Sequence, residues 1–261
     1  MPTTREPAVA GLFYPGEPSQ LQHTVADLLG ARAPTLPPPK ALIVPHAGYV
    51  YSGATAAAGY ALLAPVRERI SRVVLLGPAH RVAFRGIAMS SAADFRTPLG
   101  AVPLDTAALA SLRGLPHVGW LDQAHAQEHS LEVHLPFLQL ALDAFSLVPL
   151  VVGEADAPTV GAVLERLWGG DETLIVISSD LSHYHDYATA QALDAATSAA
   201  IEQLAPERID HGGACGRYPI GGLLWVARRK GLKCTTLELC NSGDTAGTKD
   251  RVVGYGAYAF H

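Results

Sequence analysis

The chain has 261 residues, of which 49% are hydrophobic and only 16% charged, so it can bury a large core and is not expected to be disordered. Its net charge is −5 and it has no long basic run, which disfavours nucleic acid and anionic membranes as partners. No apolar run reaches the roughly 18 residues that a membrane span needs, and no signal-peptide pattern opens the chain. Three cysteines in a long chain argue against a disulfide framework, so we expect a cytoplasmic protein.

Strands and helices are predicted to alternate along the chain. Strands are expected where short aliphatic runs end at turn residues, and helices where apolar residues recur at helical spacing. In chain order these are helix 20–29, strand 40–45, helix 53–63, strand 72–76, strand 86–90, helix 105–112, helix 129–142, strand 146–152, helix 158–168, strand 173–177, helix 187–204, helix 219–230 and strands 233–240 and 252–260. Ser19 and Asp105 are expected to cap helices, and Pro136 to kink helix 129–142.

This alternation predicts a single three-layer α/β/α sandwich with a central, mostly buried sheet. No internal repeat and no shift in composition marks a boundary, so residues 1–261 are expected to form one domain.

Polar residues directly follow four of the predicted strands. They are His46, His80, the pair Asp180 and His183, and Cys240. A lone histidine after a strand is more often an ordinary loop or core residue. In open α/β sheets, however, ligands bind beyond the carboxyl ends of the strands, and four such clusters favour one shared site.

The residue types favour a transition metal. Two imidazoles with one thiolate suit iron, copper or zinc, and three protein ligands leave positions open, as in catalytic sites. A closed structural zinc site would need four ligands, and the spacing of the cysteines does not supply them. We therefore predict a metal held by His46, His80 and Cys240.

A second group of polar residues lies at 127–134. His129 and His134 are five residues apart, which excludes the zinc-protease helix motif because the two rings would not share a helix face. Glu128 and His129 are expected to reach the pocket as acid–base or ligand-orienting groups, whereas His134 is expected to be structural.

The cysteines allow another interpretation. Cys240, with His183 as base and Asp180 as orienting group, could form a nucleophilic trio. Cys215 directly precedes a predicted helix, whose N-terminus would lower a thiol pKa, but a small packed cysteine is the commoner case.

Motifs along nearly the whole chain resemble those of the Memo family, whose fold is similar to that of class III extradiol dioxygenases of the protocatechuate 4,5-dioxygenase type. The motifs are Arg5-x-Pro-x-Val-Ala-Gly-x-Phe-Tyr-Pro, Pro45-His-Ala-Gly-Tyr-x-Tyr-Ser-Gly53, Leu76-Gly-Pro-x-His80, Glu128-His-Ser-Leu-Glu-x-His-Leu-Pro-Phe137, Ser178-Ser-Asp-Leu-Ser-His183, Cys215-Gly-Arg-x-Pro-Ile220 and Gly254-Tyr-x-Ala-Tyr.

The resemblance implies a central mixed sheet and assigns roles to several residues. His46 and His80 match the two iron-binding histidines of the dioxygenases, and His183 matches their general base, with Asp180 beside it. Cys240 falls where those enzymes place a ligating glutamate. The resemblance also implies a radical-SAM protein as a partner in bacteria and archaea.

Three functions remain open. The first is an iron- or copper-dependent oxidoreductase, with zinc as a further candidate metal and an unknown small-molecule substrate. The second is a metal-binding or peptide-binding interaction protein without turnover. The third is a Cys–His hydrolase or transferase, which would be sensitive to thiol alkylation at Cys240 and indifferent to chelators.

Overall fold

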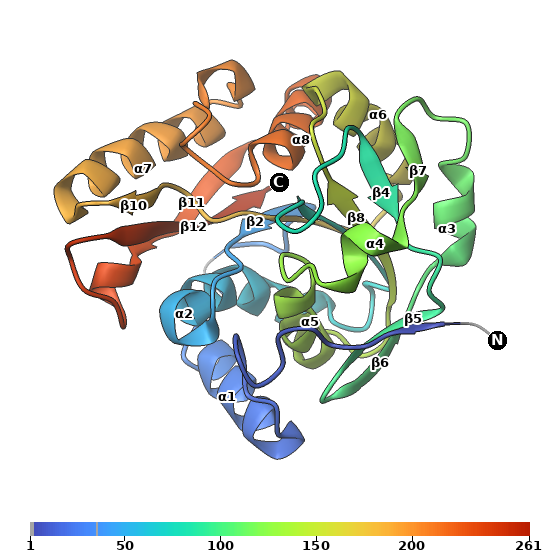
Figure 1. Ribbon diagram of the computed structural model, residues 1–261, viewed down its shortest axis with the longest axis horizontal. Helices are drawn as coiled ribbons and strands as arrows, with labels where there is room; N and C mark the ends of the chain where they lie inside the picture. The colour runs from blue at the N-terminus through green and yellow to red at the C-terminus, as the bar shows by residue number, and fades with distance from the viewer. Residues whose placement is uncertain (1–2, 35) are drawn as a thin grey trace.

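A mixed sheet runs through the centre of the molecule (Figure 1). The computed structural model describes residues 3–34 and 36–261. Within them, nine strands form this sheet in the order β10-β12-β2-β9-β3-β8-β4-β7, with β11 also paired to β12. The strands are β2 (Ala41–Val44), β3 (Arg72–Pro78), β4 (Ile87–Met89), β7 (Val118–Trp120), β8 (Ser146–Val152), β9 (Thr173–Ser178), β10 (His183–His185), β11 (Cys234–Asn241) and β12 (Val252–Phe260).

The middle of the sheet is parallel. Strands β2, β9, β3 and β8 pair side by side in parallel, so their carboxyl ends meet at one edge. All residues of β2 and β9 are buried, as expected for aliphatic runs in a sheet that is covered on both faces. Strand β12 runs antiparallel to β2, and β11 runs antiparallel to β12.

Helices cover both faces of the sheet, which confirms the predicted three-layer α/β/α arrangement (Figure 1). One layer holds α6 (Ala157–Leu167), α7 (Tyr187–Glu202) and α8 (Arg217–Lys230), and the other holds α1 (Pro18–Gly30), α2 (Tyr49–Tyr60) and α5 (Leu135–Ala141). Helices α6 and α8 pack so closely that a Cβ at Gly222 would come within 2.3 Å of Val160. None of the helices in the described ranges is long and apolar enough to cross a membrane.

A smaller sheet and several short helices complete the described structure. Strands β1 (Thr4–Arg5), β5 (Asp94–Thr97) and β6 (Gly100–Pro103) form the smaller sheet, which the sequence did not predict. The remaining elements are α3 (Thr106–Ser111), α4 (Asp122–Ala126) and the 3₁₀ turns Ala61–Val66, Glu132–His134, Pro206–Arg208 and Ser242–Asp244.

Two local predictions were wrong. The segment 129–142 is not one kinked helix: it passes through a 3₁₀ turn before α5 begins at Leu135, so Pro136 lies in the first turn of α5. Proline fits there because the first N–H groups of a helix need no intrahelical acceptor. Helix α1 is capped by the side chain of Glu17, which accepts from the backbone of Gln20, and not by Ser19. Asp105 caps α3 as predicted.

Candidate metal centre

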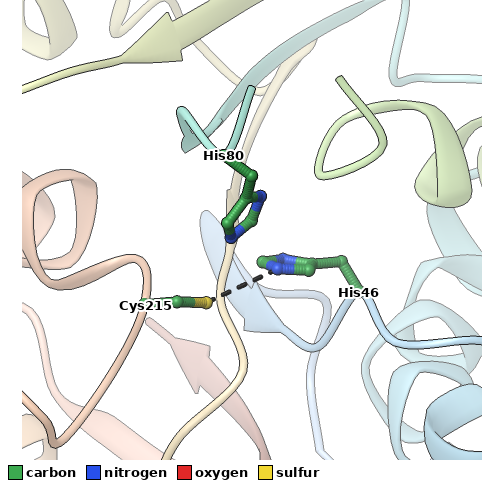
Figure 2. A group of neighbouring side chains, drawn as sticks. All are labelled: His46, His80 and Cys215. Carbon is green, nitrogen blue, oxygen red and sulfur yellow. Dashed lines mark hydrogen bonds between the residues drawn. The ribbon is translucent and has the colours of Figure 1, made fainter. Parts of the chain in front are cut away.

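Two histidines and a cysteine converge beyond the carboxyl edge of the parallel strands (Figure 2). His46 follows β2, His80 follows β3, and Cys215 lies just before α8. One ligand atom of each lies within 4.8 Å of those of the other two. His46 Nε2 and Cys215 Sγ are 3.4 Å apart. The sequence predicted that the two histidines are neighbours, but it predicted Cys240 as the cysteine beside them.

Hydrogen bonds hold the His46 ring in one tautomer. The Ser178 hydroxyl lies 2.6 Å from His46 Nδ1 and donates its proton to the Ser130 carbonyl at 2.5 Å. Because a carbonyl only accepts and Ser178 has one proton, His46 Nδ1 must be the donor to Ser178. His46 Nε2 therefore carries the lone pair, and it faces Cys215 (Figure 2).

Glu128 fixes the second ring in the same way. Its carboxylate accepts from His80 Nδ1 at 2.9 Å and from the His80 backbone N–H at 2.6 Å. Burial raises the pKa of Glu128, but the hydrogen bonds that it accepts from the ring and the backbone of His80 outweigh burial and lower the pKa to about 2. Glu128 is thus an ionised acceptor, and in the neutral His80 ring the proton lies on Nδ1 and the lone pair on Nε2. Metal-binding histidines are commonly oriented by a carboxylate in this manner.

The protonation states of His46, His80 and Cys215, as well as their positions, suit the binding of a transition metal. Burial, with the neighbouring His80 and His129, lowers the pKa of His46 well below its usual value, so the ring is neutral at pH 7. Burial and the nearby Asp180 raise the pKa of the Cys215 thiol. A bound cation would ionise this thiol. Two unprotonated imidazole nitrogens and one thiolate form a donor set for iron, copper or zinc.

The backbone of Asp180, just after β9, holds Cys215 at the site. Cys215 N donates to the Asp180 carbonyl at 3.2 Å, and Asp180 N donates to Cys215 Sγ at 3.2 Å. Gly216 permits this approach, because a Cβ there would lie 2.6 Å from the Ser178 carbonyl oxygen. The glycine that follows Cys215 was the signal in the sequence that could have indicated a close backbone contact.

Cys240 takes no part in this cluster. Its thiol lies 3.1 Å from the Thr55 hydroxyl, on the edge strand β11. Strand β12 separates β11 from β2, and two interstrand spacings of about 4.8 Å place the strands roughly 10 Å apart. The structure therefore places Cys215, and not the predicted Cys240, beside the two histidines.

Asp180 and His183 follow β9 at the same edge. Asp180 accepts from the His46 backbone N–H at 2.8 Å, and its other oxygen lies 4.0 Å from His46 Nε2. Burial raises the pKa of Asp180 to about 7. His183 Nδ1 donates to the Leu181 carbonyl at 2.8 Å, so its Nε2 is unprotonated in the neutral ring. Burial lowers the pKa of His183, which keeps that nitrogen available as a base.

His129 forms part of the wall of the site. Its ring stacks on His80 with centroids 4.7 Å apart, and Phe13 lies 4.8 Å away. Burial lowers the pKa of His129 to about 4. His134 instead contacts the Tyr60 hydroxyl through Nδ1 at 2.9 Å, inside the helical layer, consistent with a structural residue.

A cavity of about 460 Å³ opens beside Cys215. Apolar groups form much of its wall, with Arg85, Glu154 and Tyr218 at its polar positions. The guanidinium of Arg217 stacks over the Tyr218 ring at 4.0 Å from the ring centre. The volume is sufficient for a small molecule next to the thiol.

Fold and site together define a three-layer α/β protein with a candidate metal centre at the carboxyl edge of its parallel strands. A sequence profile described as Memo-like protein matches residues 5–259. The chain is 36% identical over 264 residues to a MEMO1 family protein of Aquifex aeolicus, with 96% of this chain and 97% of that protein covered. It is 34% identical to a MEMO1 family protein of Pyrobaculum arsenaticum, with 98% and 99% covered. The chain belongs to the Memo family, as its motifs indicated.

A solved structure shares the fold. The uncharacterized protein JW3007 from Escherichia coli K12 superimposes with a TM-score of 0.50 and covers 82% of this chain and 98% of its own. The sequence identity is 16%, so this likeness concerns the fold alone.

Proposed function

We propose that the protein is a metal-dependent oxidoreductase that holds one iron or copper ion through His46, His80 and Cys215. The observation that carries the proposal is the convergence of two unprotonated Nε2 atoms on one thiol, with each ring fixed in its tautomer by a separate partner. Three protein ligands leave coordination positions free for other molecules. Zinc would also fit these donors, but it would not provide redox chemistry.

Bound iron or copper would supply a redox-active centre with open coordination positions. The chain itself provides a base: the free Nε2 of His183 can accept a substrate proton while its Nδ1–H stays bonded to the Leu181 carbonyl. Asp180 holds the His46 backbone in place. The cavity beside Cys215 provides room for a small-molecule substrate.

The test separates metal binding from turnover. The wild-type protein, His46→Ala and His183→Ala are loaded anaerobically with iron(II) or copper(I), and oxygen uptake is followed with ascorbate as reductant. We expect wild-type uptake, loss of both metal and uptake in His46→Ala, and retained metal with slower uptake in His183→Ala. His23→Ala is the control, because His23 is an exposed residue of α1. Full metal loading without oxygen uptake above that of His46→Ala would instead describe a metal-binding protein without turnover.

A further inference from the structure

We propose that Arg5 is a positioning residue for the metal centre, because it clamps the turn formed by residues 125–132, which aligns both metal-binding histidines. The inference rests on the proposed metal site. Arg5 lies in the N-terminal strand β1, and its hydrogen bonds go to residues of this turn, not to the three proposed metal ligands.

The 125–132 turn orients both histidine rings. Its Glu128 carboxylate accepts from the ring and the backbone of His80. Its Ser130 carbonyl accepts from Ser178, which in turn accepts from His46. A displacement of this turn would therefore disturb both tautomer-fixing contacts at once.

Arg5 binds this turn at three points. Its Nε donates to the His125 carbonyl at 3.1 Å, its Nη2 donates to the Glu128 carbonyl at 2.7 Å, and its Nη1 pairs with the Glu132 carboxylate. Arg5 is only 7% exposed and Glu132 is fully buried. The rigid fork of a guanidinium can satisfy all three acceptors, whereas a lysine ammonium cannot span them.

Glu132 anchors the rest of the N-terminal segment to the same turn. It accepts from the backbone N–H groups of Ala8 and Val9, at 2.8 and 3.0 Å, and from the Tyr14 hydroxyl at 2.6 Å. Phe13, in the same segment, lies against the His129 ring. The segment from Arg5 to Tyr14 thus fixes one wall of the metal centre.

A buried ion pair is a poor source of stability, because desolvating two charges cancels much of their attraction. A well-packed apolar pair could fill the same space, but it could not hold the carbonyls of His125 and Glu128 in fixed positions. The three-point contact therefore supports a role in setting backbone geometry next to the ligands, beyond any contribution to folding.

The test measures cobalt(II) binding to the full chain by competition with a chelator, together with the visible spectrum of the cobalt form. In Arg5→Lys we expect cobalt affinity to fall about tenfold, as is typical when a group that orients a ligand is lost. The absorption bands should also shift, because the rings turn. Arg96→Lys is the matched control: Arg96 pairs with Glu6 at 3.2 Å at the surface and should bind cobalt as wild type does.

Tyr14→Phe keeps the test decisive if Arg5→Lys does not fold. It removes only the hydroxyl that bonds Glu132, so it should fold and show a smaller loss of affinity with a shift of the same bands. Unchanged affinity and spectrum in whichever variants fold, with a changed melting temperature alone, would reduce Arg5 to a structural role and overturn the inference. Failure of the wild type to bind cobalt would instead refute the proposed function.

Discussion

Replacing Glu128 by glutamine tests whether the site depends on its oriented histidines. Glu128 accepts three hydrogen bonds: from His80 N at 2.6 Å, from His80 Nδ1 at 2.9 Å and from Ser130 N at 3.0 Å. A glutamine has one acceptor oxygen, so its NH₂ group must face at least one of these donors. The substitution also removes the negative charge that favours a cation nearby.

We expect Glu128→Gln to weaken metal binding about 10- to 100-fold, the usual consequence of losing the carboxylate behind a ligating histidine. This corresponds to about 1.4 to 2.8 kcal/mol. Cobalt(II) competition titrations at pH 7.5 would measure it, with Gln127→Ala as the control because Gln127 is the exposed neighbour. Wild-type affinity in Glu128→Gln would refute the assignment of Glu128 as the group that orients His80.

Two further predictions concern stability. Adjacent glycines of α8 should respond oppositely to alanine. Gly222→Ala should lower the free energy of unfolding in urea by about 1–3 kcal/mol because its Cβ would overlap Val160. Gly221→Ala should raise it by up to about 1 kcal/mol because its Cβ would make an ordinary van der Waals contact with the Ala157 Cβ at 3.6 Å. Equal effects would contradict the packing of α6 on α8. Burial lowers the pKa of His134 to about 3. As pH falls below about 6.5, His134 takes up a proton in the unfolded chain but stays neutral in the folded chain. The free energy of unfolding therefore decreases by about 2 kcal/mol between pH 6.5 and 5. His134→Gln should flatten this part of the stability–pH curve of the metal-free protein, and an unchanged slope would rule out His134 as its source.

The sequence predicted the fold best at the buried strands, because burial on both faces restricts a strand to aliphatic residues. The runs that became β2, β3 and β9 are aliphatic because the sheet is covered on both faces, and their ends located His46 and His80 correctly. The smaller sheet escaped prediction because its strands are two to four residues long, too short for a pattern to emerge.

The cysteine that lies beside His46 and His80 could not be identified from strand ends alone. Cys240 lies near the end of β11, which runs in the same direction as β2, but β12 lies between these strands, and strand order is not encoded in local sequence. Cys215 belongs to a loop before a helix, and it reaches the site through backbone contacts with Asp180 that only the tertiary structure creates. The clamp formed by Arg5 and Glu132 spans 127 positions and is invisible for the same reason.

The most direct test of the proposed metal centre is the metal content of the protein purified without air or chelator, compared among wild type, Cys215→Ser and Cys240→Ser. We expect close to one iron or copper per wild-type chain, loss of that metal in Cys215→Ser and its retention in Cys240→Ser. Retention in Cys215→Ser with loss in Cys240→Ser would contradict the ligand set, and a wild-type chain that takes up no metal even on reconstitution would contradict the metal centre itself.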